Sequence, residues 1–355
     1  MSKLRGALSQ IQGRFETAER SPFDDGWANE EQTGEPFRTE VTEERARSII
    51  ARNDSPDIPF EQSINPYRGC EHGCIYCYAR PSHAYLELSP GLDFETRLFA
   101  KTNAVELLKA ELARKGYVPK PIAFGTNTDC YQPIERRYKI MRGLLEVLAA
   151  CDHPLTIVTK SALIERDIDL LAPMAKKNLV KAFVSITTLD HRLARTLEPR
   201  AASPQRRVDA LRALAGAGIP CGVMVAPLIP ALTDKSLEDV LEAAAKAGAT
   251  MAGWILLRLP NEVRPLFKEW LGAHYPQRAE HVISIVRQSR GGRENDPNFG
   301  SRMTGSGNFV DLIGKRFDLA CRRLGLNSED NHMASRHGLD CSLFRPPEEG
   351  QLRLF

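Results

Sequence analysis

The segment Arg68-Gly69-Cys70-Glu71-His72-Gly73-Cys74-Ile75-Tyr76-Cys77-Tyr78 holds three of the eight cysteines of the chain, at the spacing C-x3-C-x2-C. Three closely spaced thiolates can bind one face of a metal centre. A structural zinc ion would need a fourth ligand, which His72 or His83 would supply in a Cys3His site. An iron–sulfur cluster held by three cysteines instead keeps one iron open to a substrate or cosubstrate. Both interpretations start from the same three thiols.

Predicted strands and helices alternate around and after this segment. The apolar runs that predict strands are residues 63–65, 121–124, 155–159, 180–186, 222–225 and 254–257. Six strand–helix units in sequence predict a parallel sheet covered by helices. Six units are too few for a closed eight-stranded barrel, so an α/β partial (β/α)6 barrel or a doubly wound sheet is expected. In both folds the chemistry belongs at the carboxyl ends of the strands.

The composition excludes several classes of protein. Hydrophobic residues make up 42% and charged residues 26% of the 355, as in a globular protein rather than a disordered one. No run of about 18 apolar residues predicts a membrane-spanning helix. The polar start of the chain predicts no secretory signal peptide, so a cytoplasmic location with free cysteines is expected. The net charge of +3 is too small to indicate a nucleic-acid partner by itself.

Four regions are expected along the chain. Residues 1–59 are polar and predicted to be a poorly ordered leader with one helix near 43–51. Residues 60–260 would form the partial barrel, and residues 261–343 a helical, basic C-terminal region. Residues 344–355 are predicted to be a flexible tail.

The cysteine segment resembles the cluster loop of the radical S-adenosylmethionine (SAM) superfamily, in which an aromatic residue such as Tyr76 precedes the third cysteine. The resemblance covers residues 60–260 and implies that Cys70, Cys74 and Cys77 bind a 4Fe–4S cluster. It further implies that SAM chelates the fourth iron and is cleaved after one-electron reduction. The resulting 5′-deoxyadenosyl radical would abstract hydrogen from a substrate. A reductant such as flavodoxin or ferredoxin would then be a partner.

The sequence is more closely similar to the spore photoproduct lyase-like branch of that superfamily. The resemblance is carried by Asn65-Pro66-Tyr67-Arg68-Gly69-Cys70, Cys74-Ile75-Tyr76-Cys77-Tyr78-Ala79, Gly125-Thr126-Asn127-Thr128-Asp129 and Thr159-Lys160-Ser161. It implies that polar groups after the strands bind SAM. Lys160 would neutralise the SAM carboxylate, and Ser185 with Thr126 or Thr128 would bind its amino or ribose groups, near Asp129. The alternative is a solvated lysine and threonines that cap their own loop.

Two charged residues follow the fourth predicted strand. Glu198 and Arg200 lie in a strand–helix loop at the active face and would contact SAM or substrate; a surface salt bridge is the alternative. Arg206 and Arg207 fall in the first turn of the next predicted helix, where the helix dipole disfavours cations. That placement hints at an anionic partner.

Cys130 and Tyr131 are the candidate relays of a hydrogen atom. True spore photoproduct lyases carry a donor cysteine near the end of the second strand, and Cys130 is the nearest cysteine here. The alternative for Cys130 is a buried packing residue.

The C-terminal part contains two further signals. Residues 287–323 hold eight Lys/Arg against four acids, and the Gly–Arg loops Arg290-Gly291-Gly292-Arg293 and Phe299-Gly300-Ser301-Arg302 suit phosphate binding. A solvated helix face is the alternative. The end, Gln351-Leu352-Arg353-Leu354-Phe355, resembles the bacterial sliding-clamp-binding pentapeptide, with Gln351, Leu352, Leu354 and Phe355 as the matching positions. A frayed tail that packs on its own domain is the alternative.

These features together predict a radical SAM enzyme that acts on DNA, as a lyase-like repair enzyme for a base lesion. One alternative keeps the radical chemistry with RNA, protein or a small molecule as substrate. The other is a non-catalytic metal-binding module recruited to the sliding clamp.

Overall fold

The computed structural model describes residues 5–16, 38–328 and 338–347. Its main sheet has seven strands in the order β10-β9-β8-β7-β6-β3-β2. The strands are β2 (Ile50–Arg52), β3 (Gln62–Ile64), β6 (Ile122–Phe124), β7 (Leu155–Thr159), β8 (Val180–Ser185), β9 (Cys221–Leu228) and β10 (Met251–Leu256). The six from β3 to β10 pair in parallel, and β2 pairs antiparallel with β3 at one edge. The predicted α/β fold with six parallel strands is confirmed.

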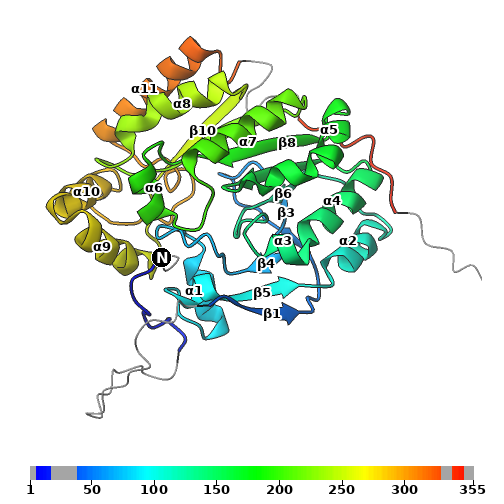
Figure 1. Cartoon of the computed structure of the whole chain (residues 1–355), viewed down its shortest axis with the longest axis horizontal. Coiled ribbons are helices and arrows are strands. Elements are labelled where there is room, and N and C mark those ends of the chain that lie inside the picture. Colours follow the sequence, from blue (N-terminus) through cyan, green and yellow to red (C-terminus); the bar gives the residue numbers. More distant parts are fainter. Residues whose placement is uncertain (1–4, 17–37, 329–337, 348–355) are drawn as a thin grey trace, which may run out of the picture.

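Helices cover the outer face of this curved sheet (Figure 1). The long ones are α2 (Ala104–Leu112), α4 (Ile140–Ala150), α5 (Ile168–Lys176), α7 (Pro204–Gly216) and α8 (Leu237–Lys246). The connections also contain α3 (Glu135–Tyr138), η3 (Ala162–Asp167), α6 (His191–Leu197) and η4 (Asp234–Ser236), and α6 packs with the cysteine loop through Leu193 and Leu197. Helix α4 shows why they form, because Leu144, Leu145 and Leu148 recur at helical spacing and are fully buried. Helix α7 begins where predicted, with the Ser203 hydroxyl accepting from the backbone N–H of Arg206 at 3.4 Å.

The C-terminal region is helical, as predicted. It contains α9 (Val263–His274), α10 (Pro276–Gln288) and α11 (Asn308–Leu324). Helix α11 lies beside α8 (Figure 1), and Arg316 pairs with Glu238 at 2.6 Å. Phe344, which the sequence analysis assigns to the tail, packs against Tyr117 and His153. Residues 351–355, with the predicted clamp-binding motif, lie outside the described residues.

The predicted helix near 43–51 is wrong. Residues in this stretch form strand β2 and part of β1 (Glu40–Glu44), which pairs in parallel with β5 (Arg97–Lys101). A second sheet results, in the order β1-β5-β4, with β4 at Tyr67–Arg68. The buried Glu111 carboxylate in α2 accepts the backbone N–H of Ile49 at 2.6 Å and of Ile50 at 3.3 Å. These distant partners override the local pattern.

Part of the predicted leader is also ordered. Residues 5–16 pack beside the segment that contains η2 (Arg80–Leu86) and α1 (Asp93–Thr96). The Glu95 carboxylate accepts the backbone N–H of Gly6 at 2.9 Å and of Ala7 at 2.8 Å. The predicted boundaries at 60, 260 and 343 stay predictions. Within the described ranges no helix has the length and apolar character needed to cross a bilayer.

Candidate functional site

The cysteine loop joins β4 to η2. The backbone N–H of Gly73 donates to Cys70 at 3.3 Å and that of Cys77 to Cys74 at 3.2 Å, so two successive turns bring the thiols into one region. Cys70 and Cys74 are buried and Cys77 is half-buried. Burial raises the pKa of the Cys74 thiol to about 12, although the positive charge of Lys160 opposes this rise. Apolar burial alone therefore favours protonated thiols, and a positive partner is needed to hold them as thiolates.

Arg80 fixes this loop from inside the protein. Its buried guanidinium donates to the carbonyl oxygens of Cys74 at 2.9 Å and Gly73 at 3.2 Å, and it forms an ion pair with Glu95. Two further donations reach Pro90 and Gly91. This role was not predicted from the sequence, because an arginine three positions after the last cysteine carries no local sign of its partners.

Gln132 holds the start of the same loop. Its amide nitrogen donates to the Gly69 carbonyl at 3.1 Å, and its oxygen accepts the backbone N–H of Glu71 at 2.9 Å. Gly69 has a φ of +72°, and a Cβ there would lie 2.6 Å from a methyl carbon of Leu98. Glycine is required at this turn because both the backbone conformation and the space exclude a side chain.

The two histidines considered as zinc ligands have other partners. His72 Nδ1 lies 3.3 Å from Asp129 Oδ2, and His83 Nε2 lies 2.9 Å from the Arg97 carbonyl oxygen. Across residues 5–16, 38–328 and 338–347, no three Cys, His, Asp or Glu side chains are arranged around one metal ion. The arrangement gives no support to a Cys3His zinc site. The same finding covers Cys70, Cys74 and Cys77, so their assignment to a three-cysteine cluster stays a prediction from their spacing in one loop.

Tyr76, Lys160 and Glu198 meet beside Cys74. The Tyr76 hydroxyl donates to the Glu198 carboxylate, which also accepts from Thr187 at 2.7 Å. The Lys160 Nζ atom lies 5.8 Å from the centroid of the Tyr76 ring. These three predicted residues come from the cysteine loop, the end of β7 and the end of α6.

Neighbouring opposite charges keep Glu198 and Lys160 ionised. Burial would raise the pKa of Glu198, but the charges of Arg207 and Lys160 lower it to about 2. Burial would lower the pKa of Lys160, but the negative charges of Cys74 and Glu198 raise it. Lys160 is therefore a cation, although its side chain is half-buried. Arg207 pairs with Glu198 and donates to the Ser185 carbonyl at 3.0 Å, which links Ser185 to the network.

The loop after β6 mostly supports its neighbours. Asp129 accepts from the backbone N–H of Lys160 and from the Thr159 hydroxyl, both at 2.7 Å. Burial would raise the pKa of Asp129, but the positive charge and hydrogen bond of His72 help to lower it to about 2. Thr128 donates to the Tyr67 carbonyl at 3.0 Å. These contacts fit the alternative in which the threonines and the aspartate organise the loop.

Thr126 lies closer to the mouth of the site. Its hydroxyl accepts from the Asn65 side chain at 3.2 Å, and its carbonyl accepts the Tyr78 hydroxyl.

Cys130 and Tyr131 are both fully buried in the main hydrophobic core, and only Tyr131 also lines the cavity. Burial raises the pKa of the Cys130 thiol well above the usual range. The structure therefore does not place these two neighbours on one cavity surface.

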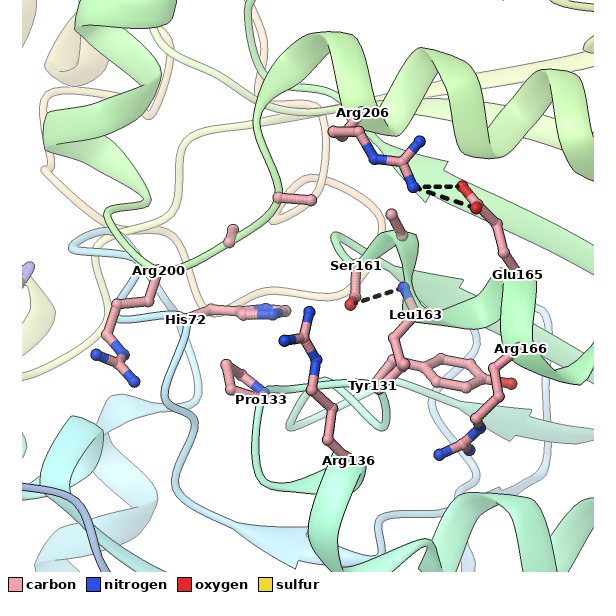
Figure 2. Close-up of a pocket in the computed structure, with 13 residues that line it drawn as sticks. His72, Tyr131, Pro133, Arg136, Ser161, Leu163, Glu165, Arg166, Arg200 and Arg206 are labelled. Carbon is pink, nitrogen blue, oxygen red and sulfur yellow. Dashed lines mark hydrogen bonds and ion pairs between the residues drawn. The ribbon is translucent and has the colours of Figure 1, made fainter.

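A cavity of about 510 Å³ adjoins the cysteine loop, at the carboxyl ends of β6, β7 and β8 (Figure 2). It is lined by His72, Tyr131, Pro133, Arg136, Ser161, Ala162, Leu163, Glu165, Arg166, Arg200, Ala201, Ala202 and Arg206. Arg200 reaches Glu71 of the cysteine loop, with Nη2 2.8 Å from Oε1. Both residues lie largely within the protein, so this pair differs from the surface salt bridge considered for Arg200.

A second surface, Tyr78 with Arg258, lies next to the third cysteine. Tyr78 is 48% exposed, and the Arg258 guanidinium carbon lies 5.5 Å from its ring centroid. Arg302, from one predicted Gly–Arg loop, lies 4.6 Å from the Phe299 ring centroid and pairs with Asp57 at 2.6 Å. Arg258 was not predicted as a site residue, although its position just after the sixth strand was a usable signal.

Arg290, from the other Gly–Arg loop, has an internal role. It is buried and donates to backbone carbonyls that include Leu257 at 2.9 Å and Arg302 at 3.0 Å. Arg290 therefore fastens the loop to the end of β10 and is not presented to a ligand.

Comparison with known proteins assigns the family. The sequence model of the Radical SAM superfamily matches residues 64–244, more than half of the chain. The chain belongs to the radical SAM superfamily.

Relatives with the same domain are known from other organisms. An uncharacterised protein of Mycobacterium tuberculosis strain H37Rv is 40% identical over 233 residues, covering 65% of this chain and 68% of that protein. An uncharacterised protein of Methanocaldococcus jannaschii is 28% identical over 246 residues, covering 69% of this chain and 87% of that protein.

The fold of this radical SAM protein is similar to that of spore photoproduct lyase. A structure of that lyase complexed with dinucleoside spore photoproduct matches with a TM-score of 0.57 and 18% identity, covering 81% of this chain and 80% of that one. The predicted membership of the superfamily and the likeness to spore photoproduct lyase are thus confirmed.

Proposed function

We propose that this protein binds a 4Fe–4S cluster through Cys70, Cys74 and Cys77 and cleaves SAM reductively. The observation that carries the proposal is the half-buried Lys160 at the carboxyl end of β7, whose Nζ atom lies 5.8 Å from the ring centroid of Tyr76 in the cysteine loop. When bound, the cluster supplies the electron that converts SAM to methionine and a 5′-deoxyadenosyl radical. The family membership supports this chemistry, and the three thiols supply its donor set.

The chain's own residues would bind and orient SAM. The Lys160 ammonium neutralises the SAM carboxylate, because Glu198 is already paired with Arg207 and leaves Lys160 without an ion pair of its own among the residues described. The positive charge of Lys160 also favours the thiolate form of Cys74. Tyr76 and Ser185 position SAM, and Thr126 at the mouth contacts its polar end. Arg200 acts at the cavity wall rather than on SAM.

The proposed substrate is nucleic acid, and specifically DNA with a damaged base. The Tyr78–Arg258 surface supports this, because exposed aromatic rings stack on bases while arginines attract the phosphate backbone. Tyr78 follows Cys77 directly, so a base on its ring would lie next to the cysteine loop. The likeness in fold to a lyase solved with a dinucleoside photoproduct agrees with such a substrate.

The proposal also covers the sliding clamp, the electron donor, the cellular location and the hydrogen-atom donor. Residues 351–355 would bind the sliding clamp through their Leu and Phe side chains. A flavodoxin or ferredoxin would supply the electron, and the reaction would take place in the cytoplasm. Cys130 or Tyr131 would return a hydrogen atom to the product; both are fully buried, and Tyr131 alone of the two lines the cavity.

The substrate proposal is tested by the formation of 5′-deoxyadenosine. The anaerobic, cluster-loaded protein is given dithionite and SAM with untreated DNA, ultraviolet-irradiated DNA or RNA. We expect product to form fastest with irradiated DNA. In that reaction, Tyr78→Ala should remove most of the stimulation, whereas Tyr85→Ala, which changes another exposed tyrosine (69% exposed), should not. Equal rates in all three tubes would contradict damaged DNA as the substrate.

A further inference from the structure

The cavity beside the cysteine loop contains more positive groups than SAM binding uses. Its described lining includes Arg136, Arg166, Arg200 and Arg206, against a single carboxylate, that of Glu165. The four arginines belong to α3, η3, the loop after α6 and α7, so the fold brings them together from separate segments. Figure 2 shows their side chains around one space.

Two of these arginines are fixed by carboxylates behind the wall. Arg166 pairs with Glu135 at 2.7 Å and with Asp167 at 2.8 Å. Arg200 Nη2 pairs with Glu71, but its Nε is buried and has no acceptor among the described residues. A buried donor without a partner is costly, so an acceptor is expected to come from a ligand or from solvent in the cavity.

The other two arginines are available to a ligand. Arg136 is exposed and points into the centre of the cavity (Figure 2), and its guanidinium makes no hydrogen bond or ion pair within the part of the chain that is described. Arg206 faces Glu165 with two N–O distances of 3.1 Å and lies 3.8 Å from Asp209. The Arg206 side chain is exposed, and exposed ion pairs contribute little and are readily exchanged.

The N-terminus of α7 adds to the positive potential. Ala201 and Ala202, which precede the N-cap residue Ser203 of this helix of 13 residues, line the cavity. The dipole of the helix disfavours Arg206 in its first turn, and a bound anion would offset both positive contributions. This gives a physical reason for the arginine that the sequence analysis marked as misplaced.

We propose that this cavity binds the phosphate group of a nucleotide, either a free one or one unit of a nucleic-acid strand. Arg136 and Arg206 are the ligands, and Arg200 lines the same cavity. Guanidinium groups match the geometry of phosphate oxygens, and about 510 Å³ accommodates a nucleotide-sized ligand. The inference does not depend on SAM cleavage, because binding is measured without turnover.

The test measures binding by the anaerobic, cluster-loaded full chain, without reductant. The ligands are inorganic pyrophosphate, thymidine 5′-monophosphate and a fluorescent single-stranded oligodeoxynucleotide. Binding is compared for the wild type, Arg136→Gln, Arg206→Gln and the control Arg137→Gln. Arg137 is an exposed neighbour in α3 that does not line the cavity. Because all three arginines are exposed, circular dichroism should show that the variants are folded.

We expect Arg136→Gln and Arg206→Gln each to weaken binding by about tenfold, with Arg137→Gln unchanged. For the oligonucleotide, each should also reduce the slope of log affinity against log salt by about 1. The same loss for the mononucleotide or pyrophosphate identifies a free phosphate ligand, and loss for the oligonucleotide alone identifies a strand. Equal binding by all four proteins would overturn the inference. It would also be overturned if Arg136→Gln raised the SAM concentration needed for cleavage and left phosphate binding unchanged.

Discussion

At the scale of single residues, Lys160 shows how this site differs from a simple metal-binding loop. Its ammonium lies among Cys74, Tyr76 and Glu198, and the carboxylate of Glu198 is occupied by Arg207. The cation therefore remains available to a carboxylate that enters the site. The same cation stabilises negative charge on the nearest thiol, so one residue serves both the proposed cluster and the proposed SAM.

The three cysteines should be separable from the other five by substitution. Cys74→Ala should lose the iron–sulfur absorbance and most of the bound iron and sulfide, because two thiolates cannot retain the cluster. Cys341→Ala changes a half-buried thiol in residues 338–347 and should retain the absorbance, the iron and the sulfide. Iron and sulfide assays on anaerobically purified proteins provide the measurement. Full cluster content in Cys74→Ala would refute the assignment of ligands.

Glu198 should make stability depend on pH. Its pKa falls from an ordinary 4.5 to about 2 in the folded protein, so its ionised form stabilises the fold above pH 4.5. This contribution is lost as the pH falls from about 5 through about 2. Asp129, whose pKa is also lowered to about 2, contributes with the same sign.

Glu198→Gln should therefore destabilise the protein at neutral pH by about 3–5 kcal/mol, because Arg207 is left buried without its partner. As the pH is lowered from about 5 to about 3, the free energy of unfolding should fall less for the variant than for the wild type. Urea unfolding of the cluster-free protein at several pH values measures both effects. Glu146→Gln, which changes an exposed carboxylate, should follow the wild type. Parallel pH profiles for Glu198→Gln and the wild type would show that Glu198 does not carry the effect.

At the scale of elements, the cysteine loop is built on contacts between distant segments. Arg80 binds four carbonyl groups and Glu95, and Glu95 in turn binds the backbone of residues 6 and 7. Gln132, after β6, binds the other end of the loop. The loop is therefore held in shape by its surroundings before any cluster is present.

Arg80→Met keeps the apolar stem of the side chain but removes its charge. It should lower the free energy of unfolding by about 3–5 kcal/mol, because the Glu95 carboxylate remains buried and unpaired. Less iron should also be retained per chain. Chemical unfolding and iron assays check both, with Arg212→Met on the exposed face of α7 as the control. Unchanged stability and iron content would contradict a role for Arg80 in shaping the loop.

The alternating strands and helices could be predicted from the sequence. The structure of a segment could not be predicted where it depends on contacts with residues far along the chain. Residues 155–159 and 180–186 are apolar runs that any parallel sheet buries, so the positions of β7 and β8 followed from pattern alone. Residues 43–51 were predicted to be helical because nothing nearby shows that Glu111 accepts two of their backbone N–H groups.

The same limit applies to the site. The spacing of the cysteines and the position of Lys160 after a strand predicted one region of the fold for the site, and the structure brings Lys160 close to Tyr76 of the cysteine loop. The internal roles of Arg80, Gln132 and Arg290 depend on contacts that cross the fold, and no local pattern reveals them. Cys130 could not be assigned from sequence, because only the fold shows that it is buried in the main core.

At the scale of the whole molecule, the barrel and the tail should act independently. Deleting residues 351–355 should abolish binding to a bacterial sliding clamp, because the apolar anchors of the motif are removed. Cleavage of SAM should be unchanged, because the candidate site is formed by residues 65–207. Surface plasmon resonance with immobilised clamp measures the first effect, and a chain whose last five residues are scrambled is the control. Equal clamp affinity with and without residues 351–355 would contradict clamp binding by these residues.

The central claim is that the three cysteines support reductive cleavage of SAM. The most direct test is to incubate the anaerobic, cluster-loaded protein with dithionite and SAM and to measure 5′-deoxyadenosine by liquid chromatography. The account predicts that the wild type forms it and that Cys74→Ala does not, with damaged DNA present in both. If Cys74→Ala forms as much 5′-deoxyadenosine as the wild type, or if the wild type forms none with a complete cluster and damaged DNA, the account is contradicted.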